Sequence, residues 1–304
     1  MDLMKDLKEI IINQFVENDI AYTNTEDIHV LLRKYFNTLS KEIRPIPRKV
    51  FISKELRSKK MPEEINAIFD EIKTEFEEGS DINPHLSEKL LGVYSGFDDR
   101  LHHSWGIYHL HLSNRKKNES DFFYKRSDFL LFCIVDENAV YFIDILPHRE
   151  INVFLKQEMP EIIINNWPDL LEHCKVHGIK GASYTDEEIV QLRKNCINTF
   201  SSIDKDTYIP LGGGGLSLKG TNIKHSLSAT YLIKEIRKIE ELIIGNEDSI
   251  REEISKTVPN LPDNLDFHLF LEESGFVVKE INTGTYTYIF LDHAIHKPLK
   301  IRDS

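Results

Sequence analysis

The N-terminal third of the chain alternates apolar and polar positions at helical spacing. Apolar residues recur every three or four positions over about 2–18, which predicts an amphipathic helix. A second helix is predicted within 24–43, with Asn24 or Thr25 as its N-cap, and a third within 61–79. Between the last two, the prolines of "RPIPRKVFIS" break the helical pattern, so "KVFIS" is predicted to be a short strand.

Beyond about residue 93 the pattern changes to that of β-strands. The runs "SWGIYHLHLS", "DFLLFCIVD" and "AVYFIDILPH" predict three strands, and the "DEN" turn predicts that the second and third form a hairpin. The second run is apolar at almost every position, so its strand is expected at the centre of a sheet that is covered on both sides. The polar linker "NRKKNESDFFYKR" predicts an exposed loop.

Helical spacing returns after about residue 156, and further strands follow near the C-terminus. "EIIINNWPDLLEHCKVHG", "TDEEIVQLRKNCINTF" and "KHSLSATYLIKEIRKIEELIIG" predict helices, whereas "FHLFLEESGFVVKEINTGTYTYIFLD" predicts two or three strands. The expected fold class is therefore α+β, a small antiparallel sheet set between helical N- and C-terminal regions. We expect three consecutive parts: a helical region over 1–90, the sheet core over 91–155 and an α+β region over 156–304.

Composition narrows the classes of function. The 304 residues carry a formal net charge of −12, whereas a protein that binds nucleic acid over its whole surface usually carries net positive charge. Any nucleic-acid site must then be a local basic patch. No apolar run approaches the roughly 20 residues that span a bilayer, and the N-terminus lacks the features of a signal peptide, so we expect a cytoplasmic protein with no membrane partner. The three cysteines form no Cys-x-x-Cys pair, which argues against a thiolate zinc site.

The stretch "RLHHSWGIYHLHLS" holds four histidines and is the main candidate for a functional site. Alternate side chains of a strand share a face, so His109 and His111 would lie about 7 Å apart on one side. Leu110 and Leu112 would lie on the other side and are the better candidates for the core. The histidine face is therefore expected to be partly accessible. The same pattern also fits half-exposed strand residues that have no catalytic role.

A divalent metal is one expectation for these histidines. A His-x-His pair on a strand can hold a transition metal when a third ligand comes from a neighbouring strand. His148, at the end of the third predicted strand, or Asp144 would supply that ligand. Under this alternative the protein is a metal-dependent enzyme that uses His109, His111 and His148.

RNA cleavage without a metal is the other expectation. The reaction removes a proton from a 2′-hydroxyl, stabilises charge at the phosphate and protonates the 5′-oxygen that leaves. Histidine suits both proton transfers because its pKa lies near 7, and arginine suits the phosphate. We expect His109 or His111 to act as the base and His148 as the acid, while Arg126 and Arg149 hold the scissile phosphate.

The linker after the first strand would bind the nucleic acid. Its segment "RKKNESDFFYKR" has five basic and two acidic residues, which is the local basic patch that an acidic chain requires. Aromatic side chains interleaved with basic ones can stack on bases. The residues expected to contact RNA are Tyr108, Arg115, Lys116, Lys117 and Lys125, with Phe122, Phe123 and Tyr124 as further stacking candidates.

Several features of about residues 85–155 occur in a fixed order. A helix comes first, then the strand that Trp105 opens, Arg126 ahead of "DFLLF", the "DEN" turn, and His148-Arg149 after "YFIDILP". This order resembles the core of RelE/ParE-like toxins, in which one or two helices precede a strand meander. The resemblance implies a toxin-type ribonuclease that acts without a metal, in growth arrest or phage defence. The acidic remainder of the chain would then be a regulatory or partner-binding shell.

The function expected from the sequence is that of an RNA-cleaving, toxin-type endoribonuclease that needs no cofactor. Its expected partners are RNA, free or on the ribosome, and a regulatory protein. Two alternatives stay open: the metal-dependent enzyme, and a non-catalytic module that binds another protein.

Overall fold

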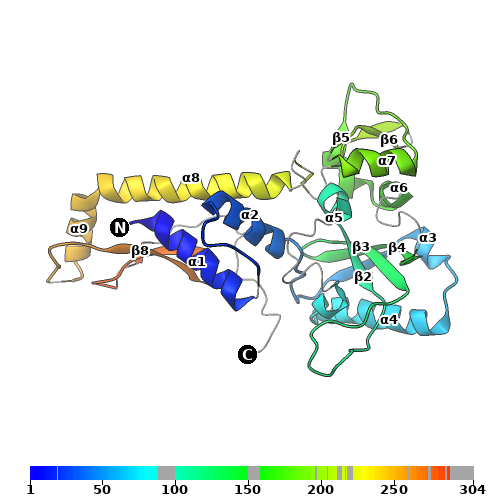
Figure 1. The fold of residues 1–304 in the computed structure, drawn as a ribbon, viewed down its shortest axis with the longest axis horizontal. Coiled ribbons are helices and arrows are strands. Elements are labelled where there is room, and N and C mark those ends of the chain that lie inside the picture. The colour runs from blue at the N-terminus through cyan, green and yellow to red at the C-terminus, as the bar shows by residue number, and fades with distance from the viewer. Residues whose placement is uncertain are drawn as a thin grey trace. The chain divides into compact units, whose positions relative to one another are not determined.

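The computed structural model shows helices and strands that form two compact units (Figure 1). The residues it describes are 1–18, 20–87, 100–149, 158–195, 197–203, 205–210, 214–215, 217, 222–258, 260–272, 275–284 and 286–287. Unit 1 comprises Met1–Ser40 and His225–Ser304, and unit 2 comprises Lys41–Lys224. Both units combine helices with a small sheet, so the α+β fold class expected from the sequence is confirmed.

This division differs from the three consecutive parts, 1–90, 91–155 and 156–304, that the sequence predicts. Unit 1 joins the two ends of the chain because they share one apolar core. Helical spacing shows which face of a segment is apolar, but it does not show which distant segment covers that face.

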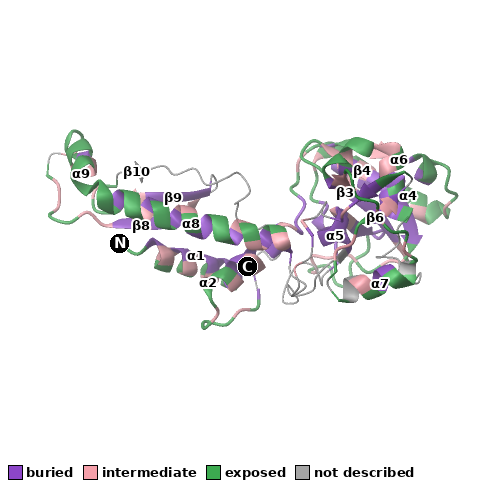
Figure 2. Ribbon diagram, turned by 90° about the horizontal axis from the view of Figure 1, so that it is seen from above, coloured by how far each residue is buried: buried purple, intermediate pink, exposed green. Residues whose placement is uncertain are grey.

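Unit 1 packs helices against a three-stranded sheet. α1 (Leu3–Glu17) buries Leu3, Leu7, Ile11 and Phe15 at the helical spacing that predicts it. The long α8 (Ile223–Gly245) carries buried and exposed stripes, which Figure 2 shows as alternating bands. The remaining elements are α2 (Ile28–Leu39), α9 (Glu247–Ser255), β8 (Phe267–Glu272), β9 (Gly275–Glu280) and β10 (Tyr286–Thr287), and the strand order is β10-β9-β8.

The start of α2 differs from the sequence prediction. The N-cap is Asp27, whose carboxylate accepts a hydrogen bond of 2.8 Å from the amide of His29. Asn24 and Thr25, the predicted caps, lie in the turn before it. The helix therefore begins at Ile28, later than the pattern of charges indicates.

The main sheet of unit 2 has four strands in the order β1-β4-β3-β2. β3 (Phe129–Val135) and β4 (Ala139–Pro147) form the predicted antiparallel hairpin, and β2 (Ile107–His111) pairs antiparallel to β3. β1 (Lys49–Ile52), the predicted "KVFIS" strand, lies parallel to β4. β3 is therefore a central strand, and its residues 130–133 are buried on both faces, as the apolar run predicts.

Different helices cover the two faces of this sheet. α4 (Glu63–Glu78) covers one face, where the ring of Phe142 lies 5.4 Å from that of Phe69 and 5.8 Å from that of Phe76. α6 (Glu158–Asn166) covers the other face, where Met159 and Ile163 join the core around Phe132. Figure 2 colours most of β3 and β4 as buried, and Figure 1 shows α4 and α6 on opposite sides of the sheet.

Two glycines fix the ends of elements next to this sheet. α4 ends at Gly79, whose φ is 79° and where a Cβ would lie 2.5 Å from Cδ of Pro47. Gly106, with a φ of 71°, ends α5 (Arg100–Trp105) and starts β2. The predicted strand "SWGIYHLHLS" is therefore wrong at its start, because Trp105 belongs to a helix.

The rest of unit 2 is a second small sheet and short helices. Its strands run in the order β5-β7-β6. These elements are α3 (Lys54–Arg57), η1 (Asn83–His85), η3 (Pro168–Cys174), β5 (Lys175–Val176), α7 (Asp186–Lys194), β6 (Ser201–Ile203) and β7 (Asp206–Tyr208). Across all described residues, none of the helices combines the length and apolar character needed to cross a membrane.

Candidate functional site

The sheet brings two of the predicted histidines together. His111 ends β2, and His148 follows the last residue of β4, where its amide donates a hydrogen bond of 2.8 Å to the carbonyl of Asp128. The two imidazole rings stack, with centroids 5.7 Å apart and planes 25° from parallel. We call His111 and His148 the histidine pair. The ring of His109 lies farther along β2, 6.4 Å from the ring of Phe132.

The expected accessibility of the histidine face is wrong. His109 is 7% exposed and His111 is 2% exposed. The alternation along β2 is as predicted, but the side expected to be open is buried together with Ile107, which belongs to the core under α6. His148 is half-buried and is the member of the histidine pair that solvent reaches.

His111 is neutral near pH 7. Burial is the largest cause, and together with the nearby His109, His148, Arg126 and His85 it lowers the pKa of His111 to about 3. Its Nδ1 accepts a hydrogen bond of 3.3 Å from the amide of Ser127, so the ring hydrogen sits on Nε2. The neutral ring therefore offers a donor at Nε2, and the role of base that the sequence suggested for it does not fit.

His148 is the histidine suited to proton transfer. Burial lowers its pKa from the ordinary value, and Arg126 and His109 lower it further, whereas Asp128 opposes them. The ring is therefore unprotonated near pH 7 and can accept a proton. Arg126 is the charged side chain with the largest effect on His148, and both Arg126 and Arg149 are exposed. Arg149 forms an exposed ion pair of 4.0 Å with Asp128.

The linker between β2 and β3 is an exposed loop, as predicted. We call residues 112–128 the basic loop. Lys116 and Tyr124 form a β-bridge across it, and the amide of Lys125 donates a hydrogen bond of 2.7 Å to the carbonyl of Arg115. At the tip, Asn118 bonds to the carboxylate of Asp121. The side chains of Arg115, Lys116, Lys117, Lys125 and Arg126 are all exposed.

The predicted aromatic contacts divide into two groups. Tyr108 lies on the opposite face of β2 from His109 and His111, and its ring packs edge-on against His102 at 4.4 Å. The structure therefore does not bring Tyr108 to the histidine pair. Phe122 and Phe123 are half-buried in the basic loop, with centroids 5.0 Å apart.

A buried polar pair beneath the basic loop was not predicted from the sequence. His85, in η1, is 1% exposed, and its Nδ1 donates to the carbonyl of His111 at 3.1 Å. Its Nε2 lies 3.0 Å from Oε2 of Glu75 on α4. His85 therefore bridges the end of β2 and α4 through its two ring nitrogens. No local motif marks these residues, which are ten positions apart.

The geometry gives the divalent-metal alternative no support. Within the described part of the chain, no group of three or more His, Cys, Asp and Glu side chains is placed to hold a metal ion. The carboxylate of Asp144, an expected ligand, is instead bound by Nζ of Lys59 at 2.7 Å and 2.8 Å. Nδ1 of His111 is already an acceptor for the amide of Ser127.

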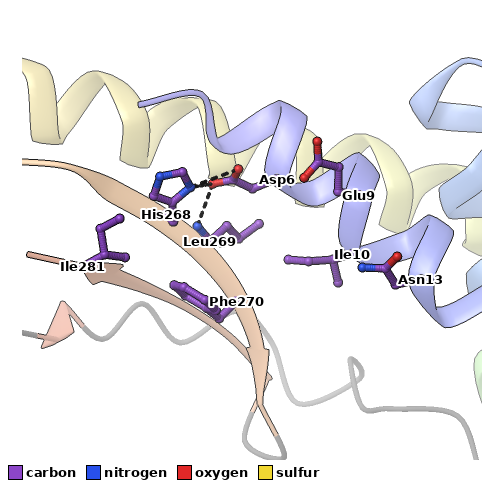
Figure 3. A pocket seen from close by; sticks show the side chains of 8 residues that line it. All are labelled: Asp6, Glu9, Ile10, Asn13, His268, Leu269, Phe270 and Ile281. Carbon is purple, nitrogen blue, oxygen red and sulfur yellow. Dashed lines mark hydrogen bonds and ion pairs between the residues drawn. The ribbon is translucent and has the colours of Figure 1, made fainter. Parts of the chain in front are cut away.

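Unit 1 has a shallow pocket of about 360 Å³ between α1 and the edge strand β8 (Figure 3). His268 lies at this pocket between two carboxylates: its Nδ1 is 3.1 Å from Oδ2 of Asp6, and its Nε2 is 3.3 Å from Oδ2 of Asp266. Asp6 also accepts a hydrogen bond of 2.9 Å from the amide of Leu269. A charged His268 therefore links α1 to β8.

Docking of α1 on β8 should weaken as pH rises above about 6.5. Burial lowers the pKa of His268, but the hydrogen bonds and charges of Asp6 and Asp266 outweigh it and raise that pKa above its ordinary value. A group with a raised folded pKa stabilises the fold at low pH and loses that contribution as pH rises through its folded pKa. Hydrogen exchange of the Leu269 amide, corrected for the intrinsic exchange rate at each pH, measures the strength of this docking. We expect the protection of that amide to fall by about a few-fold as the pH rises.

The neighbouring charges and a control define this experiment. Lys279 lies opposite His268 on β9, and the N-terminal amine lies 4.0 Å from Asp266. His268→Gln should remove the pH dependence, whereas His29→Gln, on the exposed side of α2, should keep it. Protection that is independent of pH in the unaltered protein would contradict the prediction.

No protein-family model, curated protein or solved structure matches this chain. The resemblance to the RelE/ParE-like toxin core therefore stays a prediction.

Proposed function

We propose that unit 2 binds RNA at the basic loop and cleaves it at His148 without a metal ion. The observation that carries the proposal is the stack of His148 on the neutral His111, beside Arg126 and at the base of an exposed basic loop. The basic loop is a local cluster of positive charge in an acidic chain, and it adjoins a histidine that solvent reaches.

The proposed reaction is an internal transfer at phosphorus. His148 takes the proton of the 2′-hydroxyl, the 2′-oxygen bonds to phosphorus, and the bond from phosphorus to the 5′-oxygen breaks. The proton on His148 passes to that 5′-oxygen, so the products are a 2′,3′-cyclic phosphate and a 5′-hydroxyl, with no net change in protons. Arg126 and Arg149 stabilise the charge on the phosphate, and the Nε2 hydrogen of His111 is a further donor.

The remaining residues have binding roles in this proposal. Arg115, Lys116, Lys117 and Lys125 bind the phosphate backbone, and this binding should weaken as salt is added. Phe122 and Phe123 replace Tyr108 as the aromatic side chains proposed to stack on bases, because both lie in the basic loop. We further propose that the protein acts in the cytoplasm, as a toxin-type effector in growth arrest or phage defence, with RNA or the ribosome as its target and a regulatory protein as its restraint.

Total-RNA degradation by the purified protein in the presence of EDTA tests the proposal. We expect cleavage that leaves 2′,3′-cyclic phosphate ends and that EDTA does not inhibit. Cleavage that appears only after Mn²⁺ or Zn²⁺ is added would refute the metal-free reaction and favour the metal-dependent alternative. Neither cleavage nor salt-sensitive binding of RNA would favour a module that binds another protein.

A further inference from the structure

The pair of half-buried Glu75 and buried His85 connects three elements, α4, η1 and β2. Glu75 lies on α4, and His85 lies in η1 and donates to the carbonyl of His111, the last residue of β2. The ring of Tyr124 in the basic loop packs edge-on against the ring of His85, with centroids 4.7 Å apart. The amide of Tyr124 donates a hydrogen bond of 2.9 Å to the carbonyl of Pro84.

We propose that Glu75 and His85 form a positioning pair, which holds the end of β2 and the base of the basic loop in one arrangement for the site at His148. The effect of this pair on catalysis rests on the proposed function. Its hydrogen bonds and its ring contact with Tyr124 do not depend on that function. His85 touches neither substrate nor His148 in this scheme; it acts through the backbone of His111 and the ring of Tyr124.

Burial explains why the pair can fix these elements. His85 is 1% exposed and Glu75 is 22% exposed, so water cannot readily replace either hydrogen bond. Together the two bonds, one at each ring nitrogen, fix the orientation of the imidazole ring. Loss of the Glu75 carboxylate would leave Nε2 of the buried His85 without this partner, and the ring that donates to the carbonyl of His111 would no longer be fixed.

The position of the basic loop matters for the site at His148 because Arg126 lies near the C-terminal end of that loop. Tyr124 is two residues before Arg126, and Arg126 is the charge that most affects His148. If Tyr124 moves away from His85, the guanidinium and the histidine pair no longer hold a constant distance. Displacement by about 1 Å can reduce a reaction rate by about a hundredfold.

The test compares two glutamates of the same helix. Glu75→Ala removes the partner of His85, whereas the matched control Glu71→Ala removes a carboxylate one turn earlier. Glu71 accepts a bond of 2.8 Å from Asn114 at the exposed base of the same loop. Hydrogen exchange of the Tyr124 and Lys125 amides reports the order of the loop, and the amide of Leu131 in the centre of β3 reports global unfolding. Glu75→Gln, which keeps the shape of the side chain, guards against misfolding.

We expect Glu75→Ala to lower the protection of Tyr124 and Lys125 by about tenfold, as the loss of about one hydrogen bond would. The protection of Tyr124 and Lys125 should not change in Glu71→Ala. The protection of Leu131 should not change in Glu75→Ala. RNA cleavage by Glu75→Ala should fall about tenfold to a hundredfold. The midpoint of its pH–rate profile should move up, because Arg126 no longer stays beside His148; unfolding alone would not move that midpoint.

Unchanged protection of Tyr124 and Lys125 in both Glu75 variants would overturn the proposal. An equal loss in Glu75→Ala and Glu71→Ala, or a loss that includes Leu131, would also overturn it. If the unaltered protein cleaves no RNA, the proposed function fails, but the exchange measurement still decides whether the pair positions the loop.

Discussion

Replacing His148 with alanine should reduce RNA cleavage by about 10²–10⁴-fold, because a general acid–base group contributes about that factor. The ring lies half-buried after the end of β4, so its removal takes away the stack on His111 without opening the core. The unaltered protein should lose activity as pH falls through the lowered pKa of His148, since the base must be unprotonated. Initial rates between about pH 4 and pH 8 measure both effects.

Two variants make this result specific. His177→Ala removes an exposed imidazole from the same unit and should cleave RNA at the normal rate. Arg126→Ala should lower the rate and move the pH midpoint up, because its charge lowers the pKa of His148. Normal cleavage by His148→Ala would show that this histidine does not take part in the reaction.

Replacing Phe142 with alanine should lower the free energy of unfolding of unit 2 by about 3–5 kcal/mol. Phe142 is 0% exposed and lies between Phe69 and Phe76, so its loss leaves a cavity between the sheet and α4. Both tryptophans, Trp105 and Trp167, belong to unit 2. Urea unfolding followed by tryptophan fluorescence therefore measures the stability of this unit.

The control for Phe142 changes a ring at the edge of the same sheet. Phe51 on β1 is half-buried and stacks on Tyr141 at 5.2 Å. Phe51→Ala should lower the free energy of unfolding far less than Phe142→Ala, because water already reaches part of the Phe51 ring. Phe142→Leu, which keeps most of the volume, should cost less than about 1.5 kcal/mol. An equal loss of unfolding free energy in Phe142→Ala and Phe51→Ala would contradict this prediction. It would mean that the rings of Phe142, Phe69 and Phe76 are not the centre of the core.

Patterns along the chain predict the strands and helices of this protein well where each element's own residues decide its structure. The hairpin of β3 and β4 follows from two apolar runs and one turn, and α4 ends where Gly79 predicts. The start of β2 was missed because α5 precedes it directly, and Gly106 is the only residue between the two. One glycine with positive φ is enough to turn a helix into a strand.

The site was predictable only in part. The order of the strands brings His111 and His148 together, as the positions of both at strand ends suggest. The burial of His109 and His111 was not predictable, because the elements that cover them come from other parts of the chain. Glu75 and His85 left no signal either, since a helix and a 3-10 turn joined by an ordinary loop form no motif.

The composition of unit 1 has a consequence for the order of folding during synthesis. The core of this unit joins α1 to α8, β8 and β9, which leave the ribosome only after the whole of unit 2. At about 5–20 residues per second, the synthesis of unit 2 takes roughly 10–40 s. During that time the apolar face of α1 has only α2 from the core of unit 1 to pack against. Unit 2, in contrast, is continuous and can fold as soon as it emerges. The nascent chain therefore carries an incompletely buried apolar segment, α1 with α2, ahead of a folded unit, and exposed apolar surface of this kind is what chaperones bind.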